Sequence, residues 1–176
     1  GFSAKYTLDI AQALYEKHKV ITYPRTDSKA LPEDYAPVCK KIVEKLPEAY
    51  NAFKKDIFDN NWIYPQKKFV FNNNEVSDHF AIVPTEFTSD SLNENEQKIY
   101  DAIVRRFLSV FFPPAEWAVT TRLSTINDHT FKTEGRVLVS PGWLKVMQRS
   151  ETKEALPALI PEDKGKAQLV KCERLD

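Results

Sequence analysis

The spacing of apolar residues changes at a pair of prolines, Pro113-Pro114. Before this pair, apolar residues at 99–111 recur at steps of three and four, which predicts a long helix with one wide apolar face. After it, apolar and polar residues alternate along 117–124, the pattern of a half-buried strand. The sequence therefore predicts an α+β chain, with a helical part followed by one long helix and an antiparallel β-rich part.

Four helices are predicted before the prolines. Their starting signals are a Ser3 cap, Pro32 in a first turn, the acidic start at Glu48, and a capping box of Asn93 with Glu96. The first helix is expected to end near His18, which we interpret as a capping or surface residue. Three helices followed by a short strand expected at 68–71 are typical of a winged-helix arrangement.

The second half of the chain is predicted to be β-rich. A turn at Asn127-Asp128 separates the first strand from a second at 131–140, and a third β piece is expected at 143–147. A last strand is expected at 167–172, after a charged surface loop. We expect two domains, residues 1–90 with a winged-helix-like fold and residues 91–176 as an incomplete second domain.

A dense group of reactive side chains lies at Val20–Ser28, where the sequence is VITYPRTDS. The β-branched and aromatic residues at 20–23 predict a short buried strand, which Pro24 ends because proline has no backbone N–H. An extended backbone through Pro24 would place Tyr23 and Arg25 on the same side, a phenol beside a planar cation. A phosphodiester could bridge them, so both are candidate catalytic residues.

The same segment also fits a purely structural role. A tyrosine at a strand end is usually a core or rim residue, and an arginine near an aspartate is usually part of a surface ion pair. His79, in the run SDHFAIVPT, fits a loop histidine whose ring bonds to the backbone. A non-catalytic nucleic-acid-binding module of winged-helix type and a structural or interaction domain therefore remain alternatives to an enzyme.

Composition sets limits on the partners. The 176 residues include 25 basic and 25 acidic ones, so any DNA site must depend on local placement of Arg and Lys. Two distant cysteines, Cys39 and Cys172, suit reduced structural thiols. No glycine-rich phosphate loop and no acidic cluster for Mg²⁺ is present, and no apolar run is long enough for a membrane span. We expect no metal site here and no membrane association, and we expect the protein to be cytoplasmic.

Three runs resemble one enzyme family. GFSAKYTLDIAQALYE followed by ITYPRTDS is similar to the active-site segment of type IA DNA topoisomerases, in particular the topoisomerase III branch. SDHFAIVPT resembles the second signature of that family, and the residues from LNENEQKIY to GWLKVM resemble its downstream helix and strands. One departure is visible, because Phe80 stands where the topoisomerase III pattern has a second histidine.

The resemblance implies a function and a set of roles. Tyr23 would attack a phosphodiester in single-stranded DNA and form a transient link to the 5′ phosphate, with Arg25 as a phosphate contact. His79, Thr26 and Ser28 would bind DNA, and a positively charged His79 would stabilise charge on the phosphoryl oxygens.

The resemblance also sets expectations about the rest of the protein. Mg²⁺ would be bound by a domain that precedes this chain. We expect the chain itself to be a fragment of a bacterial, nucleoid-associated enzyme and to be inactive in isolation. A sheet edge left open in residues 115–176 would then invite self-association.

Overall fold

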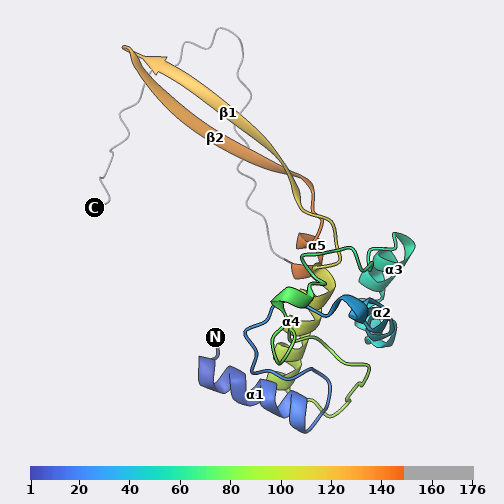
Figure 1. Cartoon of the computed structure of the whole chain (residues 1–176). Helices are drawn as coiled ribbons and strands as arrows, with labels where there is room; N and C mark the ends of the chain where they lie inside the picture. The colour runs from blue at the N-terminus through green and yellow to red at the C-terminus, as the bar shows by residue number, and fades with distance from the viewer. Residues whose placement is uncertain (149–176) are drawn as a thin grey trace. The chain divides into compact units, whose positions relative to one another are not determined.

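The computed structural model describes residues 1–148, which are helical at first, continue into a two-stranded antiparallel sheet and end in a short helix (Figure 1). They form two compact units, residues 1–116 with 139–148, and residues 117–138. The α+β prediction is confirmed at this level. The domain division predicted between residues 90 and 91 stays a prediction. None of the helices described has the length and apolar character needed to cross a membrane.

The first helix, α1 (Ala4–Glu16), forms as predicted from its cap. The Ser3 hydroxyl accepts a hydrogen bond from the Tyr6 amide at 3.3 Å, which gives one N-terminal N–H group a partner. Ile10, Ala11 and Leu14 are the buried residues of this helix. Through this face α1 packs against the long helix α4, so the start of the chain lies beside residues almost 90 positions later.

Helix α4 (Glu94–Ser109) has the predicted capping box. The Asn93 side chain accepts from the Glu96 amide at 3.0 Å, and the Glu96 carboxylate accepts from the Asn93 amide at 2.8 Å. The predicted apolar face is buried, with Tyr100, Val104, Phe107 and Leu108 in the core. Helix α4 contacts α1 and α5 (Leu144–Met147), so it is the central element of the first unit (Figure 1).

The interpretation of His18 as a capping or surface residue is wrong. His18 is 9% exposed, and its Nε2 lies 3.3 Å from a carboxylate oxygen of Glu96, whose side chain is also buried. Its Nδ1 lies 3.2 Å from the Ser89 hydroxyl. The physical reason is a chain reversal at Lys19, where φ is +61°, which folds the chain back so that the first turn of α4 covers the ring. The Asn93 amide, and then His18, hold the pKa of Glu96 below its usual range.

Helices α2 (Ala36–Lys45) and α3 (Asn51–Asp59) complete the helical part. Each begins with a 3₁₀ turn, η1 (Glu33–Tyr35) before α2 and η2 (Glu48–Tyr50) before α3. Cys39 on α2 is fully buried, and this burial raises the pKa of its thiol to about 12. Such a thiol stays protonated at neutral pH, which agrees with the structural role predicted for it. Cys172 lies outside the described residues.

The short strands predicted at 20–23 and 68–71 are wrong, because each place has only an isolated bridge. Ile21 pairs antiparallel with Pro84, and Leu31 pairs parallel with Phe71. Pro24 and Pro84 lack the N–H groups that would extend the first pairing. A further 3₁₀ turn, η3 (Asn73–Glu75), follows the second bridge.

The β piece predicted at 143–147 is also wrong, since these residues form helix α5. The reversal begins at Gly142, where φ is +46° and a Cβ atom would lie 2.4 Å from the Pro113 carbonyl oxygen. Trp143 then donates its amide to that same carbonyl at 3.0 Å. Tertiary contact with the end of α4 therefore overrides the β propensity of this segment.

The sheet consists of β1 (Glu116–Ile126) and β2 (His129–Ser140). Asn127 and Asp128 both have positive φ, at +49° and +65°, as a two-residue type I′ turn requires, so the predicted turn is confirmed. The strands meet through Thr125 with Thr130 and Thr121 with Glu134, and Arg136 lies 5.0 Å from the Trp117 ring centroid. The strand predicted at 167–172 lies outside the described residues.

A buried lysine links the loop after α3 to the end of α4. Lys67 is 7% exposed, and its ammonium group donates to the Phe111 carbonyl at 2.5 Å. Burial lowers the pKa of Lys67 from 10.5 to about 8. At a pH between these two pKa values, the folded chain therefore binds fewer protons than the unfolded chain. The contribution of Lys67 to the unfolding free energy thus increases as the pH rises through this range.

We expect Lys67→Met to remove this rise. In urea titrations, the unfolding free energy of the wild type relative to the variant should increase by about 1–2 kcal/mol between about pH 7.5 and pH 9.5. Buried Cys39 and the tyrosines, whose pKa values are raised, affect both proteins alike and cancel in the difference. A difference that does not change with pH would show that Lys67 keeps its ordinary pKa.

Candidate active site around Tyr23

The site is built on the pairing of two segments that lie far apart in the sequence. The Thr22 amide donates to the Val83 carbonyl at 2.9 Å, and the Thr85 amide donates to the Val20 carbonyl at 3.0 Å. The Thr22 hydroxyl adds two bonds, donating to the Ala81 carbonyl at 3.0 Å and accepting from the Val83 amide at 2.9 Å. This pairing places the residue after Thr22 next to the segment that carries the candidate histidine.

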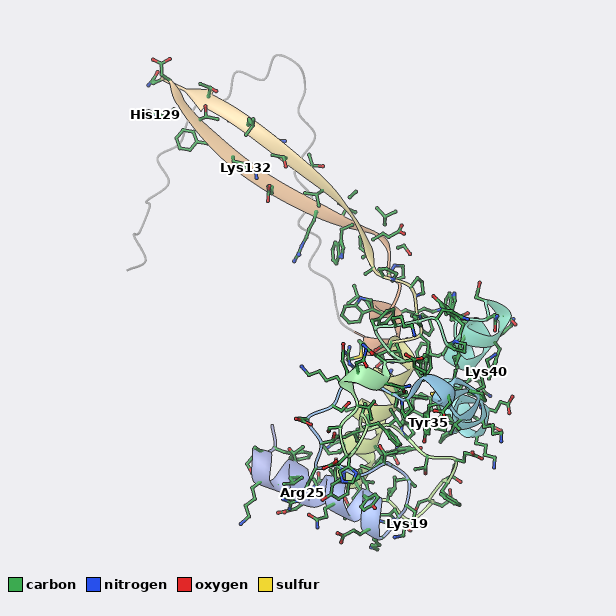
Figure 2. All side chains as sticks on the ribbon, in the orientation of Figure 1. Lys19, Arg25, Tyr35, Lys40, His129 and Lys132 are labelled. Carbon is green, nitrogen blue, oxygen red and sulfur yellow. The ribbon has the colours of Figure 1, made fainter. Side chains whose placement is uncertain are left out.

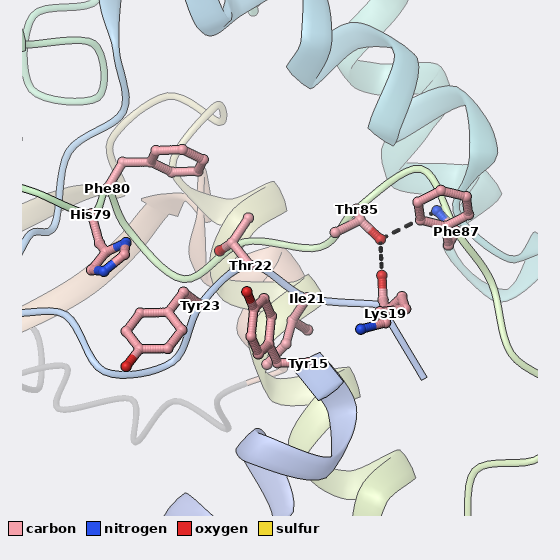
Figure 3. Close-up of a pocket in the computed structure, with 9 residues that line it drawn as sticks. All are labelled: Tyr15, Lys19, Ile21, Thr22, Tyr23, His79, Phe80, Thr85 and Phe87. Carbon is pink, nitrogen blue, oxygen red and sulfur yellow. Dashed lines mark hydrogen bonds between the residues drawn. The ribbon is translucent and has the colours of Figure 1, made fainter. Parts of the chain in front are cut away.

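Tyr23 and His79 are in direct contact. Their ring centroids are 4.3 Å apart with the planes tilted by 41°, and Tyr15 contacts Tyr23 edge to face at 5.4 Å (Figure 3). Tyr23 is half-buried and His79 is exposed. The two candidates that the sequence places 56 positions apart, at 23 and 79, are thus brought together by the fold.

A pocket of about 370 Å³ opens at these rings. Figure 3 shows its lining, which consists of Tyr15, Lys19, Ile21, Thr22, Tyr23, His79, Phe80, Thr85 and Phe87. The Lys19 carbonyl accepts from the Thr85 hydroxyl at 2.6 Å, and the Thr85 hydroxyl accepts from the Phe87 amide at 3.2 Å. These bonds fix the end of the pocket opposite His79.

Two residues of the pocket were missed by the sequence interpretation. Tyr15 appears in the sequence only as part of an apolar helix face, and Lys19 only as a cation near a helix end. In the structure the Lys19 ammonium group lies 5.9 Å from the Tyr15 ring centroid, within the range of a cation–π contact. No local signal announces either role, because both depend on the chain reversal at Lys19.

Arg25 does not line this pocket. Its side chain is exposed and donates to the Gln12 side-chain oxygen of α1 at 3.2 Å, and Figure 2 shows it beside that helix. The expected approach of Arg25 to the phenol therefore stays a prediction. Among the described residues, Gln12 is the partner whose hydrogen bond the guanidinium would give up to reach a phosphate at Tyr23.

Thr26 and Ser28 hold the backbone of the histidine segment. The Thr26 hydroxyl donates to the His79 carbonyl at 3.1 Å and accepts from the Ser28 amide at 3.0 Å. The Ser28 hydroxyl donates to the Glu75 carbonyl at 2.7 Å. The structure thus gives both residues a positioning task beside Tyr23 and His79.

Phe80 fills the position at which the family pattern has a second histidine. Its ring is half-buried and lies 4.9 Å from that of Tyr35 at an angle of 48°. The pKa of the Tyr35 phenol is raised, first of all by burial. Phe80 therefore serves as apolar wall, and His79 is the one imidazole in the lining of the pocket.

The arrangement offers a nucleophile and a polar neighbour for an anionic substrate. A half-buried phenol at the mouth of a pocket can attack a phosphorus atom, and an imidazole in contact with it can stabilise the charge on the phosphoryl oxygens. Within residues 1–148, no group of three or more His, Cys, Asp or Glu side chains is placed to hold a metal ion. The described residues therefore do not fit a Mg²⁺ site.

Comparison with known proteins decides the family. The family model described as DNA topoisomerase matches residues 1–175. The chain belongs to the DNA topoisomerase family. The resemblance to the topoisomerase III branch is confirmed by this family match together with the relatives named DNA topoisomerase 3 that follow.

The curated relatives of this topoisomerase chain are bacterial. It is 39% identical over 172 residues to DNA topoisomerase 3 of Bacillus licheniformis and 39% identical over 173 residues to DNA topoisomerase 3 of Bacillus subtilis. Each match covers 93% of this chain and 24% of the relative. The chain thus spans about a quarter of the length of these relatives.

A solved structure has a similar fold. It is that of full-length topoisomerase I from Thermotoga maritima, with a TM-score of 0.59 and 25% sequence identity. The match covers 92% of this chain and 26% of that protein. Similarity thus extends from the helical part into the β-rich part of the sequence.

We expect Thr22→Val to destabilise the site. Valine has nearly the shape of threonine but leaves the Ala81 carbonyl and the Val83 amide without their side-chain partner, at a cost of about 1–3 kcal/mol in unfolding free energy. Urea denaturation measures this cost. Thr88→Val, at an exposed position farther along the same segment, is the matched control and should change stability by less than about 0.5 kcal/mol. Equal effects of the two substitutions would contradict the assigned role of Thr22.

Proposed function

We propose that the protein to which this chain belongs cleaves and reseals one strand of DNA through Tyr23. The observation that carries the proposal is the contact of Tyr23 with His79 at the mouth of a pocket, in a chain of the DNA topoisomerase family. The Tyr23 oxygen attacks the phosphorus, a bond to the 5′ phosphate forms, and the bond from phosphorus to the 3′ oxygen breaks. The phenolic proton is lost, and the departing 3′ oxygen leaves as a hydroxyl.

Resealing reverses these steps. The same 3′ hydroxyl attacks the phosphotyrosine after another strand has passed through the break, and Tyr23 leaves with its proton restored. A phenol suits both directions because its aryl oxide is a tolerable leaving group, so the covalent link conserves the energy of the phosphodiester without ATP. Positive charge near the reacting phosphate assists the loss of the phenolic proton during attack.

The neighbouring residues have separate proposed roles. His79, in contact with the Tyr23 ring, stabilises the charge that builds on the phosphoryl oxygens. Arg25 exchanges its bond to Gln12 for a two-pronged contact with the phosphate. Thr26 and Ser28 border the DNA strand and hold the backbone of the histidine segment.

Other parts of the proposal concern the whole protein. The substrate is single-stranded DNA. Mg²⁺ is bound by a domain outside residues 1–176, so these residues alone are expected to be inactive. Residues 1–90 act as a winged-helix-like tyrosine domain, supported by the order of α1, α2 and α3 and by the two bridges that tie the segment between α1 and α2 to the segment after α3. The exposed edges of the β1–β2 hairpin allow self-association of isolated chains. The whole protein acts at the nucleoid, in the bacterial cytoplasm.

A non-catalytic nucleic-acid-binding module of winged-helix type is the second candidate. The hydrogen bonds and ring contacts around Tyr23 would then serve structure alone, and the phenolic oxygen would have no chemical task. Substitution of that one oxygen therefore separates the two candidates.

We expect Tyr23→Phe in the full-length protein to abolish strand cleavage and to leave binding of single-stranded DNA within a few-fold. The ring and its contacts remain, and only the nucleophilic oxygen is lost. Denaturing gels that detect DNA linked to protein provide the measurement. Tyr15→Phe is the matched control, because it removes the hydroxyl of the adjacent tyrosine and should leave cleavage intact. Linked DNA in the Tyr23→Phe lane would refute the assignment.

We expect Arg25→Lys to lower the rate of cleavage at least ten-fold, about 1.4 kcal/mol of transition-state stabilisation. An ammonium group cannot make the two parallel bonds that a guanidinium makes with phosphate oxygens. Single-turnover cleavage measures the rate. Gln12→Ala removes the resting partner of Arg25 but keeps the cation, so it should cleave at nearly the normal rate. A normal rate for Arg25→Lys would show that Arg25 belongs to the surface alone.

A further inference from the structure

A second, larger groove of about 1040 Å³ borders the site. It shares both site-forming segments, because Thr26 and Ser28 line it from one and residues 81–83 line it from the other. The remaining walls come from the loop after α3, the end of α4 and the residues around Pro113. The same two segments thus form both the pocket at Tyr23 and this groove.

The groove is positively charged although the chain as a whole is neutral. Lys29, Lys67 and Arg106 line it, against a single carboxylate, that of Glu75. Lys29 and Arg106 are exposed, and within residues 1–148 neither forms an ion pair with a carboxylate. A local excess of two positive charges favours an anionic occupant.

Aromatic rings form another part of the lining. Phe69 is 69% exposed and Tyr64 is 41% exposed, and Trp62 and Trp143 also face the groove. The buried Lys67 ammonium group lies 5.3 Å from the Phe69 ring centroid and 5.6 Å from that of Tyr64. Exposed rings beside cations are the surface on which unpaired nucleic-acid bases stack while phosphates are neutralised.

We propose that this groove binds the single-stranded DNA that continues in the 3′ direction from the phosphate held by Tyr23. This inference rests on the proposed function, because the link to the 5′ phosphate determines which side of the break stays attached to this domain. The bases stack on Phe69 and Tyr64, and the phosphates pass Arg106 and Lys29. A duplex fits less well, since its bases already stack on one another and offer no free faces to the rings.

The test uses the full-length protein and synthetic single strands of DNA. Wild-type cleavage first maps the break and shows that Tyr23 forms the link. Binding is then measured with Tyr23→Phe protein on strands that extend increasingly far on the 3′ side of the break, or on the 5′ side. We expect 3′ extension to tighten binding and Phe69→Ser to weaken the extended complex by about five-fold or more. Extending the strand on the 3′ side with duplex DNA should not tighten binding to a comparable extent.

Two matched controls isolate the groove. Phe58→Ser removes another exposed phenylalanine, and Lys98→Gln removes another exposed cation of α4; neither residue lines the groove. Both should leave the gain from 3′ extension unchanged. Arg106→Gln should lower the slope of log affinity against log salt by about 0.7, the value for one phosphate contact in a single strand. Because Phe69 and Arg106 are exposed, these variants should fold normally.

The outcomes separate the two hypotheses. Suppose that Phe69→Ser and Arg106→Gln leave cleavage intact and do not change the increase in affinity that 3′ extension gives. The groove assignment alone would then be overturned. An equal loss on 5′-extended strands, or an equal gain from a duplex extension, would also overturn it. A wild-type protein that makes no DNA link through Tyr23 would overturn the proposed function, and the strand assignment with it.

Discussion

The hydroxyl group of Thr22 joins the two halves of the site. It bonds to the Ala81 carbonyl and the Val83 amide, while backbone bonds on either side tie Val20 and Thr22 to Thr85 and Val83. Proline at 24 and 84 keeps this pairing from growing into a sheet, so the next residues are free to turn outward. Tyr23 and His79 therefore meet beside a short, well-anchored ladder and not within a buried strand.

Behind this ladder, α4 holds α1 in place. The link at one end is the contact of His18 with Glu96, a residue that also belongs to the capping box of α4. The ring of His18 is thus buried against the first turn of the long helix, and Tyr15 on α1 is positioned to contact Tyr23. The orientation of the Tyr23 phenol depends in this way on helix packing as well as on its own segment.

Charge is distributed to suit an anionic strand. Equal numbers of acidic and basic residues leave no general attraction for DNA, so the cations at the candidate site and along the adjoining groove must act locally. Arg25 lies beside α1, hydrogen-bonded to Gln12, while Lys29 and Arg106 line the groove. In the proposed function, these local cations and not the net charge of the chain would hold the strand.

Local patterns by themselves determined the Ser3 cap of α1, the capping box and apolar face of α4, and the turn at Asn127-Asp128, because each of these signals lies within a few neighbouring residues. The choice of Tyr23 depended on its group of reactive neighbours together with the family resemblance, and the choice of His79 depended on the resemblance. Only the tertiary structure decided that these two rings touch, that His18 is buried and that 143–147 is helical. Those outcomes depend on contacts between distant segments, and a chain reversal at one residue such as Lys19 redirects a segment without changing its local pattern.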